Sequence, residues 1–198
     1  IDYKIIKSND LLSFDTKTNI NSELLIDFLD YKKKESLNAS ILIKGKFKRN
    51  NQIILNLVSL KEKANKILFK NLDLSKNFKI IKIDSFNFDY KNNKKINNQL
   101  FLKRKNTNYV IEGKRFDATK LINKMRDSKE DKTSIFNNFN SRININIKKV
   151  FIDEDNFVSD LSGLINYKKN EINDLKLKSY FPNNKTINLS VKTNNQKE

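Results

Sequence analysis

Strict alternation of apolar and polar residues recurs along this chain, and a period of two fits strands rather than helices. The clearest case is residues 142–148, RININIK, where Ile143, Ile145 and Ile147 alternate with polar side chains. Other runs rich in β-branched and aromatic residues, which strands favour, are residues 40–47, 53–58, 78–83, 86–90, 175–178 and 187–192. The pattern predicts a mostly β protein.

Short polar segments rich in Asn and Lys separate these runs, at residues 48–51, 91–95, 103–106, 168–170 and 182–185. Asn tolerates left-handed backbone geometry, so it can form turns in a chain with only three glycines. Short connections join antiparallel neighbours. We therefore expect an antiparallel meander within a single β-rich segment over residues 1–198.

Two segments break the alternation. Residues 22–31, SELLIDFLDY, have helical apolar spacing, with Ser22 as the expected N-cap. Residues 117–127, DATKLINKMRD, have Asp117 as the expected N-cap and basic residues toward their end. One or two short helices are therefore predicted, and residues 128–141, which hold only isolated apolar side chains, are expected to form a flexible loop.

Alternating strands have one apolar face, and two arrangements of the sheet are compatible with such a face. In a β-sandwich a second sheet covers that face. In the other arrangement a long twisted and curved sheet leaves the face open as the wall of a groove. The alternation fits both, and Gly45, Gly113 and Gly163, in or just after strands, are candidates for the bulges or bends that curve a sheet.

The formal net charge of +17 raises the question of nucleic-acid binding. The charge comes from 35 lysines and only five arginines, and the lysines are spread along the whole chain. Arginine is the residue that phosphate and base recognition favours. Together with many Asn and Ile residues and few Ala, Gly and Pro, this composition indicates AT-rich codon usage. We expect solvated lysines and no nucleic-acid partner.

The absence of cysteine and histidine excludes disulfides, thiol chemistry, Cys/His zinc sites and histidine-based triads. Asp84, Asp89 and Glu112 show no sign of lying in an apolar cleft, so no catalytic pair is predicted. Residues 153–155, DED, lack spaced partner carboxylates and are interpreted as a turn. No catalytic residue, metal site or cofactor is expected, and the protein is not expected to be an enzyme.

A more specific signal is the segment GKRFDATKLI, residues 113–122, in which a strand leads through Gly113, Phe116 and Asp117 into a helix. This arrangement resembles the AsmA-like family, in its YhdP/TamB group of the alphaproteobacterial type. Further segments that resemble the family are residues 80–102, 143–150, 158–165 and 172–177. Lys120 stands where the family often has a proline. Asp117 as a cap and Phe116 as a hydrophobic staple also explain the motif structurally.

The resemblance implies a half-pipe sheet in the periplasm, anchored in the inner membrane by an N-terminal segment of a longer protein. A chain that begins at Ile1 is itself expected to be a piece of something longer. The implied partners are phospholipid acyl chains, passed between the inner and outer membranes. The candidate groove residues are Ile143, Ile145, Ile147, Leu175, Leu177, Ile187, Leu189 and Val191. They are expected to share one face.

Two other functions stay open. A β-rich module that helps to insert outer-membrane proteins would also fit the resemblance, and would make those proteins partners. The other open function is that of a basic nucleic-acid-binding protein. Whether the apolar face is open or covered is the observation that separates them.

Overall fold

A computed structural model describes residues 1–48, 52–127, 139–169 and 171–193, and within these residues the fold is almost entirely strand. The strands are β1 (Asp2–Ser8), β2 (Leu11–Ile20), β3 (Leu24–Ile26), β4 (Tyr31–Lys33), β5 (Ala39–Lys48), β6 (Ile53–Glu62), β7 (Asn65–Leu74), β8 (Ile80–Lys91), β9 (Asn97–Lys105), β10 (Asn108–Asp117), β11 (Ser141–Phe151), β12 (Phe157–Lys168), β13 (Glu171–Tyr180) and β14 (Thr186–Lys192). A 3-10 turn, η1 (Asp27–Leu29), and one α-helix, α1 (Thr119–Asp127), complete the elements of the described chain.

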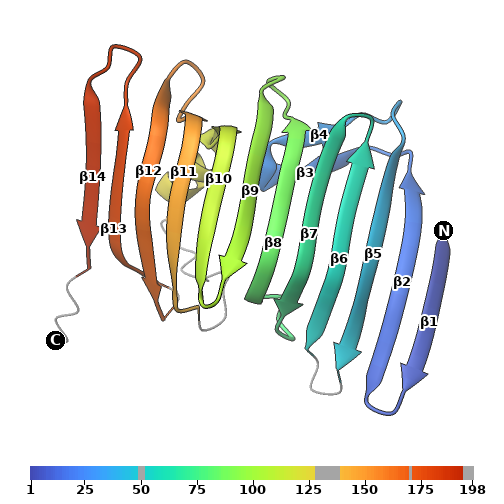
Figure 1. The fold of residues 1–198 in the computed structure, drawn as a ribbon. Coiled ribbons are helices and arrows are strands. Elements are labelled where there is room, and N and C mark those ends of the chain that lie inside the picture. The colour runs from blue at the N-terminus through green and yellow to red at the C-terminus, as the bar shows by residue number, and fades with distance from the viewer. Residues whose placement is uncertain (49–51, 128–138, 170, 194–198) are drawn as a thin grey trace. The chain divides into compact units, whose positions relative to one another are not determined.

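Twelve of these strands form one mostly antiparallel sheet that is not closed, in the order β1-β2-β5-β6-β7-β8-β9-β10-β11-β12-β13-β14 (Figure 1). The prediction of a mostly β, antiparallel open sheet is confirmed. The β-sandwich alternative is wrong, because all the long strands described belong to the same sheet and the second sheet is only the short β3–β4 hairpin.

One pair departs from the predicted meander, because β10 and β11 run parallel. Parallel neighbours need a crossover of a dozen or more residues. The chain provides one between Asp117 and Ser141, and α1 is its first part. The predicted loop at residues 128–141 falls mainly on residues 128–138, which lie outside the described residues. Phe139 is described and buried, and Ser141 already belongs to β11.

The chain divides into two compact units, an N-terminal unit of residues 1–99 and a C-terminal unit of residues 100–198. Each has its own buried residues and is described by itself below.

In the N-terminal unit, cross-strand pairing aligns apolar side chains on one face of the sheet. Residues directly opposite one another share a face. One row runs through Ile43, Val58, Phe69 and Phe86, and the next runs through Ile41, Leu60, Ile67 and Phe88. We call these eight residues the N-terminal apolar face. The opposite face is mainly polar, with Lys44, Lys61, Lys66, Lys70, Ser85 and Asp89 in the intervening positions beside Leu42, Leu57 and Leu68.

Residues 21–38, which we call the cap, leave the sheet and fold back at one end of the N-terminal apolar face (Figure 1). Tyr31 packs edge-on against the ring of Tyr90, with centroids 5.8 Å apart, and its hydroxyl donates a hydrogen bond to Oε2 of Glu62. The hydroxyl of Tyr90 donates to the carbonyl oxygen of Leu29 at 2.8 Å. Leu29 and Tyr31 are buried, so the cap shares a core with the sheet.

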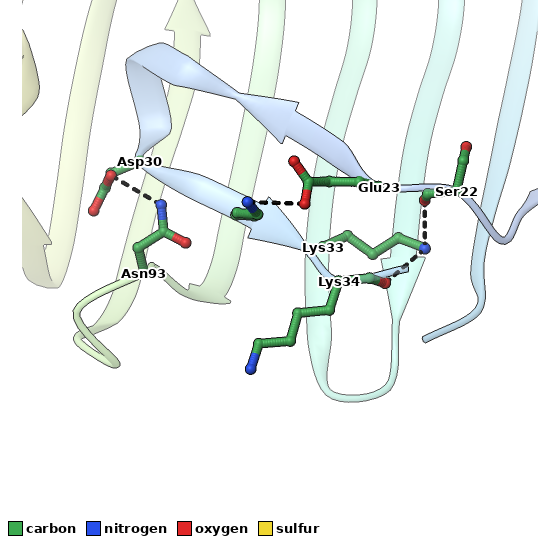
Figure 2. A network of polar contacts seen from close by, with 7 residues as sticks. Ser22, Glu23, Asp30, Lys33, Lys34 and Asn93 are labelled. Carbon is green, nitrogen blue, oxygen red and sulfur yellow. Dashed lines mark hydrogen bonds and ion pairs between the residues drawn. The ribbon is translucent and has the colours of Figure 1, made fainter. Parts of the chain in front are cut away.

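The cap also contains a fully buried lysine. The ammonium of Lys33 donates to the carbonyl oxygens of Ser22 and Lys34 at 2.7 and 3.0 Å (Figure 2). It also donates to the carbonyl oxygen of Asn21 at 3.1 Å, which uses its third donor. At the other side of the cap, Asn93 donates from Nδ2 to Oδ1 of Asp30 and from its backbone to the carbonyl of Asp30 (Figure 2). These bonds fix both ends of the β3–β4 hairpin.

The helix predicted over residues 22–31 is wrong. The segment forms β3, η1 and the start of β4 instead. A helix would carry Leu29 and Tyr31 on different faces, whereas the hairpin buries both against Tyr90 and places Tyr31 within reach of Glu62. Tertiary contacts therefore override the local helical spacing.

In the C-terminal unit, the helix predicted from Asp117 is confirmed and spans Thr119–Asp127. Asp117 ends β10, and its Oδ1 accepts a hydrogen bond from the backbone N–H of Thr119 at 3.0 Å, as a capping residue does. The backbone N–H of Ala118 donates to the carbonyl of Phe151, which ties the start of the helix to the end of β11. Figure 1 shows α1 on one side of the sheet at β10 and β11.

Candidate functional site

The eight residues predicted as groove candidates lie on one face of the C-terminal unit. Ile143 pairs with Ile165, which pairs with Leu175, which pairs with Val191. The next row runs through Ile145, Gly163, Leu177 and Leu189. Ile147 and Ile187 continue the alternation of their strands on the same side. We call this set the C-terminal apolar face.

Gly163 lies within the second of these rows, and no other residue fits there. Its φ of +152° is rarely adopted by residues with a side chain. A Cβ at this position would overlap the carbonyl oxygen of Lys176 and would lie 2.9 Å from Cα of Leu177. The pairing of β12 with β13 also shifts register between Ser159 and Ser162. The expectation that this glycine marks an irregularity in the sheet therefore fits the structure.

Exposure increases across the C-terminal apolar face toward the edge strand. Ile143, Ile147 and Leu175 are buried, and Ile145 and Leu177 are half-buried. On β14, Leu189 is 50% exposed and Val191 is 45% exposed. Buried strand faces in a closed core are fully covered. Part of this face is therefore accessible to an apolar ligand.

One end of the same face is covered by an aromatic group. Phe139 is buried and packs against Tyr109 and Tyr167, with ring centroids 5.5 Å away in both cases. Tyr109 pairs with Ile143, so this cluster lies beside the buried end of the face. Burial raises the pKa of the Tyr167 phenol. These rings extend the hydrophobic core of the C-terminal unit where the C-terminal apolar face is least exposed.

The three residues of the sequence motif have structural positions. Gly113 lies opposite Ile147 in the parallel pair of β10 and β11. Phe116 is buried and pairs with Val150, which is also buried. Asp117 is buried and holds the start of α1, as described above. The motif thus forms the strand-to-helix junction, in agreement with its structural interpretation.

The N-terminal apolar face shows a similar gradient. Near the cap, Leu60, Ile67 and Phe88 are buried, whereas Ile43 and Val58, one row further away, are half-buried. At the far end Phe47 is 41% exposed and contacts Phe14, with ring centroids 5.1 Å apart. Ile53, which pairs with Phe47, and Ile83 are buried toward the same end. The face is therefore closed by the cap at one end and only partly accessible at the other.

Sequence reasoning missed the N-terminal apolar face as a candidate site, although its strands 40–47, 53–58 and 86–90 were predicted. The signal was the run of aromatic residues at 86, 88 and 90, with Phe69 on the neighbouring strand. Phe86 and Phe88 stack with centroids 4.3 Å apart, and Phe69 lies edge-on to Phe88 at 5.3 Å. A face of this kind offers large flat apolar contacts.

Other polar candidates have structural roles. Oδ1 of Asp153 accepts hydrogen bonds from the backbone N–H groups of Asp155 and Asn156, which makes the DED segment the turn that was predicted. Oδ2 of Asp84 accepts from Nδ2 of Asn71 at 3.0 Å, and Oδ1 of Asp84 lies 3.2 Å from the ammonium of Lys82. Within the described residues, no group of three or more acidic, cysteine or histidine side chains is placed to hold a metal ion.

Over the part of the chain that the structure describes, no helix has both the length and the apolar character needed to cross a membrane. No family model, curated protein or solved structure matches this chain. The resemblance to the AsmA-like family therefore stays a prediction.

Proposed function

We propose that this chain binds acyl chains of phospholipids along the apolar faces of its sheet and belongs to a protein that carries lipid between membranes. The observation that carries the proposal is the C-terminal apolar face, on which a continuous set of Ile, Leu and Val side chains runs from buried positions to half-exposed ones. Its opposite face is polar, with Asn144, Asn146, Lys176 and Lys178 in the alternate positions. A surface with these two sides favours a ligand on the apolar side only.

The energetics suit an extended acyl chain. Each buried methylene contributes about 0.8 kcal/mol, so a chain laid along several residues of the face avoids a large hydration penalty. The face offers aliphatic contacts with few directional polar groups, so no single position would hold the ligand tightly. A uniform wall of this kind allows a lipid to slide, and it needs no catalytic residue.

The resemblance to the AsmA-like family supports the cellular part of the proposal. Under it, the chain is a periplasmic segment of a protein anchored in the inner membrane, and the lipid passes toward the outer membrane. The absence of cysteine suits an oxidising compartment such as the periplasm.

One observation favours the second candidate, a module that assists assembly of outer-membrane proteins. Strand β14 is the last in the sheet order, and its Leu189 and Val191 are exposed. Exposed edge strands are templates for pairing with a further strand. A partner strand added at this edge would be recognised by backbone hydrogen bonds, whereas an acyl chain would be recognised by the face.

The test of the proposal is a pair of substitutions on adjacent residues of β11. Ile145→Asp places a charge on the C-terminal apolar face, and Asn146→Asp places the same charge on the polar face. Both variants of the full chain are compared for thermal melting and for binding of a fluorescent fatty acid. We expect both to melt cooperatively near the parent chain, and only Ile145→Asp to lose the fatty acid, because an accessible face can hydrate a carboxylate.

Two results would contradict the proposal. If Ile145→Asp abolishes the melting transition while Asn146→Asp does not, the face is a closed core in solution and has no room for a ligand. If both variants bind the fatty acid as the parent does, the ligand does not occupy this face.

A further inference from the structure

At the end of the N-terminal unit that lies away from the cap, three described parts of the chain lie side by side. Register places Ser8 opposite Leu11, Leu11 opposite Lys48, and Leu74 opposite Ile80. The β1–β2 connection, the end of β5 and the β7–β8 connection therefore lie at the same edge of the sheet (Figure 1). We call the described residues of this edge, 7–11, 48 and 74–80, the turn edge. It is the end of the N-terminal apolar face that the cap leaves uncovered.

Phe78 projects from the turn edge into solvent. Its side chain is 71% exposed, and its φ of +57° lies in the left-handed region. Hydrogen bonds hold the turn in this form: the N–H of Phe78 donates to the carbonyl of Ser75, and the N–H of Ser75 donates to the carbonyl of Lys79, both at 2.9 Å. Oγ of Ser75 also accepts from the N–H of Lys79 at 3.1 Å.

This position is unfavourable for phenylalanine in water on two counts. The left-handed region suits Gly and Asn, and bulky residues are rare there. The other described hairpin turns of this chain have only Asn or Lys at positive φ, at Asn9, Lys63, Lys95, Asn106, Lys169 and Asn184. A large apolar ring held in water also forgoes the free energy that burial would give. A strained and exposed phenylalanine on a hydrogen-bonded turn is explained if the ring enters an apolar phase when the protein functions.

The charges around Phe78 indicate which apolar phase the ring would enter. Lys76 and Lys79 flank it in the same turn, and Lys7 and Lys48 lie on the same edge, with Asp10 as the acidic residue among them. Lys7, Lys48 and Lys76 are exposed. Basic residues around an exposed aromatic ring match the interface of a bilayer with anionic headgroups. A purely apolar protein groove would gain nothing from the lysines.

We propose that the turn edge docks on an anionic bilayer, with Phe78 inserted at the level of the headgroups and the flanking lysines paired with phosphates. The proposal rests on the proposed function, since docking there would bring the uncovered end of the N-terminal apolar face to the source of its lipid.

The test is sedimentation of the full chain with vesicles of phosphatidylcholine alone and of equimolar phosphatidylcholine and phosphatidylglycerol. We expect Phe78→Asn to lower partitioning onto the mixed vesicles by about tenfold, the loss expected when one aromatic ring is no longer buried at the headgroup level. The variant is expected to fold, since Asn suits the positive φ of this turn. Lys76→Gln is expected to weaken binding by about fivefold on the mixed vesicles, with little change on phosphatidylcholine.

Phe28→Asn is the matched control, because Phe28 is 45% exposed on the cap, at the opposite end of the unit. It is expected to leave vesicle binding unchanged. Two results would overturn the proposal that the turn edge docks on a bilayer. One is an equal loss of vesicle binding in Phe28→Asn and Phe78→Asn, and the other is no loss of vesicle binding in Phe78→Asn. The fatty acid assay distinguishes the two proposals. Phe78→Asn should still bind free fatty acid even if it no longer binds vesicles. If the proposed lipid-binding face is wrong, the comparison of Ile145→Asp with Asn146→Asp will show it.

Discussion

The hydroxyl of Tyr31 donates a hydrogen bond of 2.6 Å to Oε2 of Glu62, and both residues are buried. Tyr31 belongs to the cap and Glu62 ends strand β6. The same carboxylate oxygen accepts from Nδ2 of Asn65 at 2.9 Å. The cap therefore closes one end of the N-terminal apolar face through a specific polar contact inside an apolar surface, and its removal should be measurable.

Tyr31→Phe is predicted to lower the free energy of unfolding by about 1.5–3 kcal/mol, the usual contribution of a hydrogen bond to a charged group. Burial first, and the bond to Glu62 second, raise the pKa of the Tyr31 phenol above its ordinary value of 10.0. A phenol with a raised pKa stabilises the folded state fully below pH 10 and progressively less as the pH rises above it. Urea unfolding at pH 8 and at pH 10.5 should show a smaller pH-dependent loss in Tyr31→Phe than in the parent. An equal loss in both proteins would contradict the assignment.

Gly163→Ala is predicted to destabilise the C-terminal unit by roughly 2 kcal/mol or more, because the added methyl group meets the backbone of β13 and φ is positive. The control is Ser162→Ala, one residue earlier on β12, where the side chain is exposed. Chemical denaturation of both variants gives the comparison. Equal stability for the two would show that β12 and β13 do not approach as closely as described.

Asp117→Ala is predicted to lower stability by about 1 kcal/mol through loss of the helix cap. Hydrogen exchange should locate the effect, with faster exchange at the amides of Thr119 and Ile122. Asp117→Asn keeps an acceptor at the same place, and it should retain most of the protection. Unchanged exchange in the alanine variant would mean that the carboxylate does not hold the helix.

The lysines are predicted to be solvated and to form no nucleic-acid site. Any binding to duplex DNA should therefore be weak and should disappear at about 200 mM salt, following the release of counterions. Fluorescence anisotropy over a salt series measures this. Tight binding that persists at that concentration and is lost on changing one compact lysine cluster would contradict the prediction.

Much of the fold could be predicted from local alternation. Ile143, Ile145 and Ile147 appear as a stripe in the sequence, and their strand β11 lies where the pattern placed it. The stripes at 175–178 and 187–192 carry the same phase, so the shared face of Leu177 and Leu189 follows from register between adjacent strands.

Strand β7 shows why other parts of the fold could not be predicted from the sequence. Ile67 and Phe69 alternate normally, but Asn71 has a positive φ of 49°, and the apolar positions then continue at Leu72 and Leu74. This change of phase hides the strand from a search for strict alternation. The cap was misread for a different reason: its hairpin depends on Tyr90 and Glu62, which lie far along the chain, and the local spacing carries no sign of them.

Photo-crosslinking detects directly whether lipid occupies the C-terminal apolar face. A photoreactive phenylalanine analogue is placed in turn at Ile145, Leu177 and Leu189 on the face, and at the polar-face neighbours Asn146, Lys176 and Asn188. The full chain is then irradiated with radiolabelled phospholipid. Labelled adducts are expected from the first three positions and none from the second three. Adducts of equal yield from both sets, or none from either, would contradict lipid binding at this face.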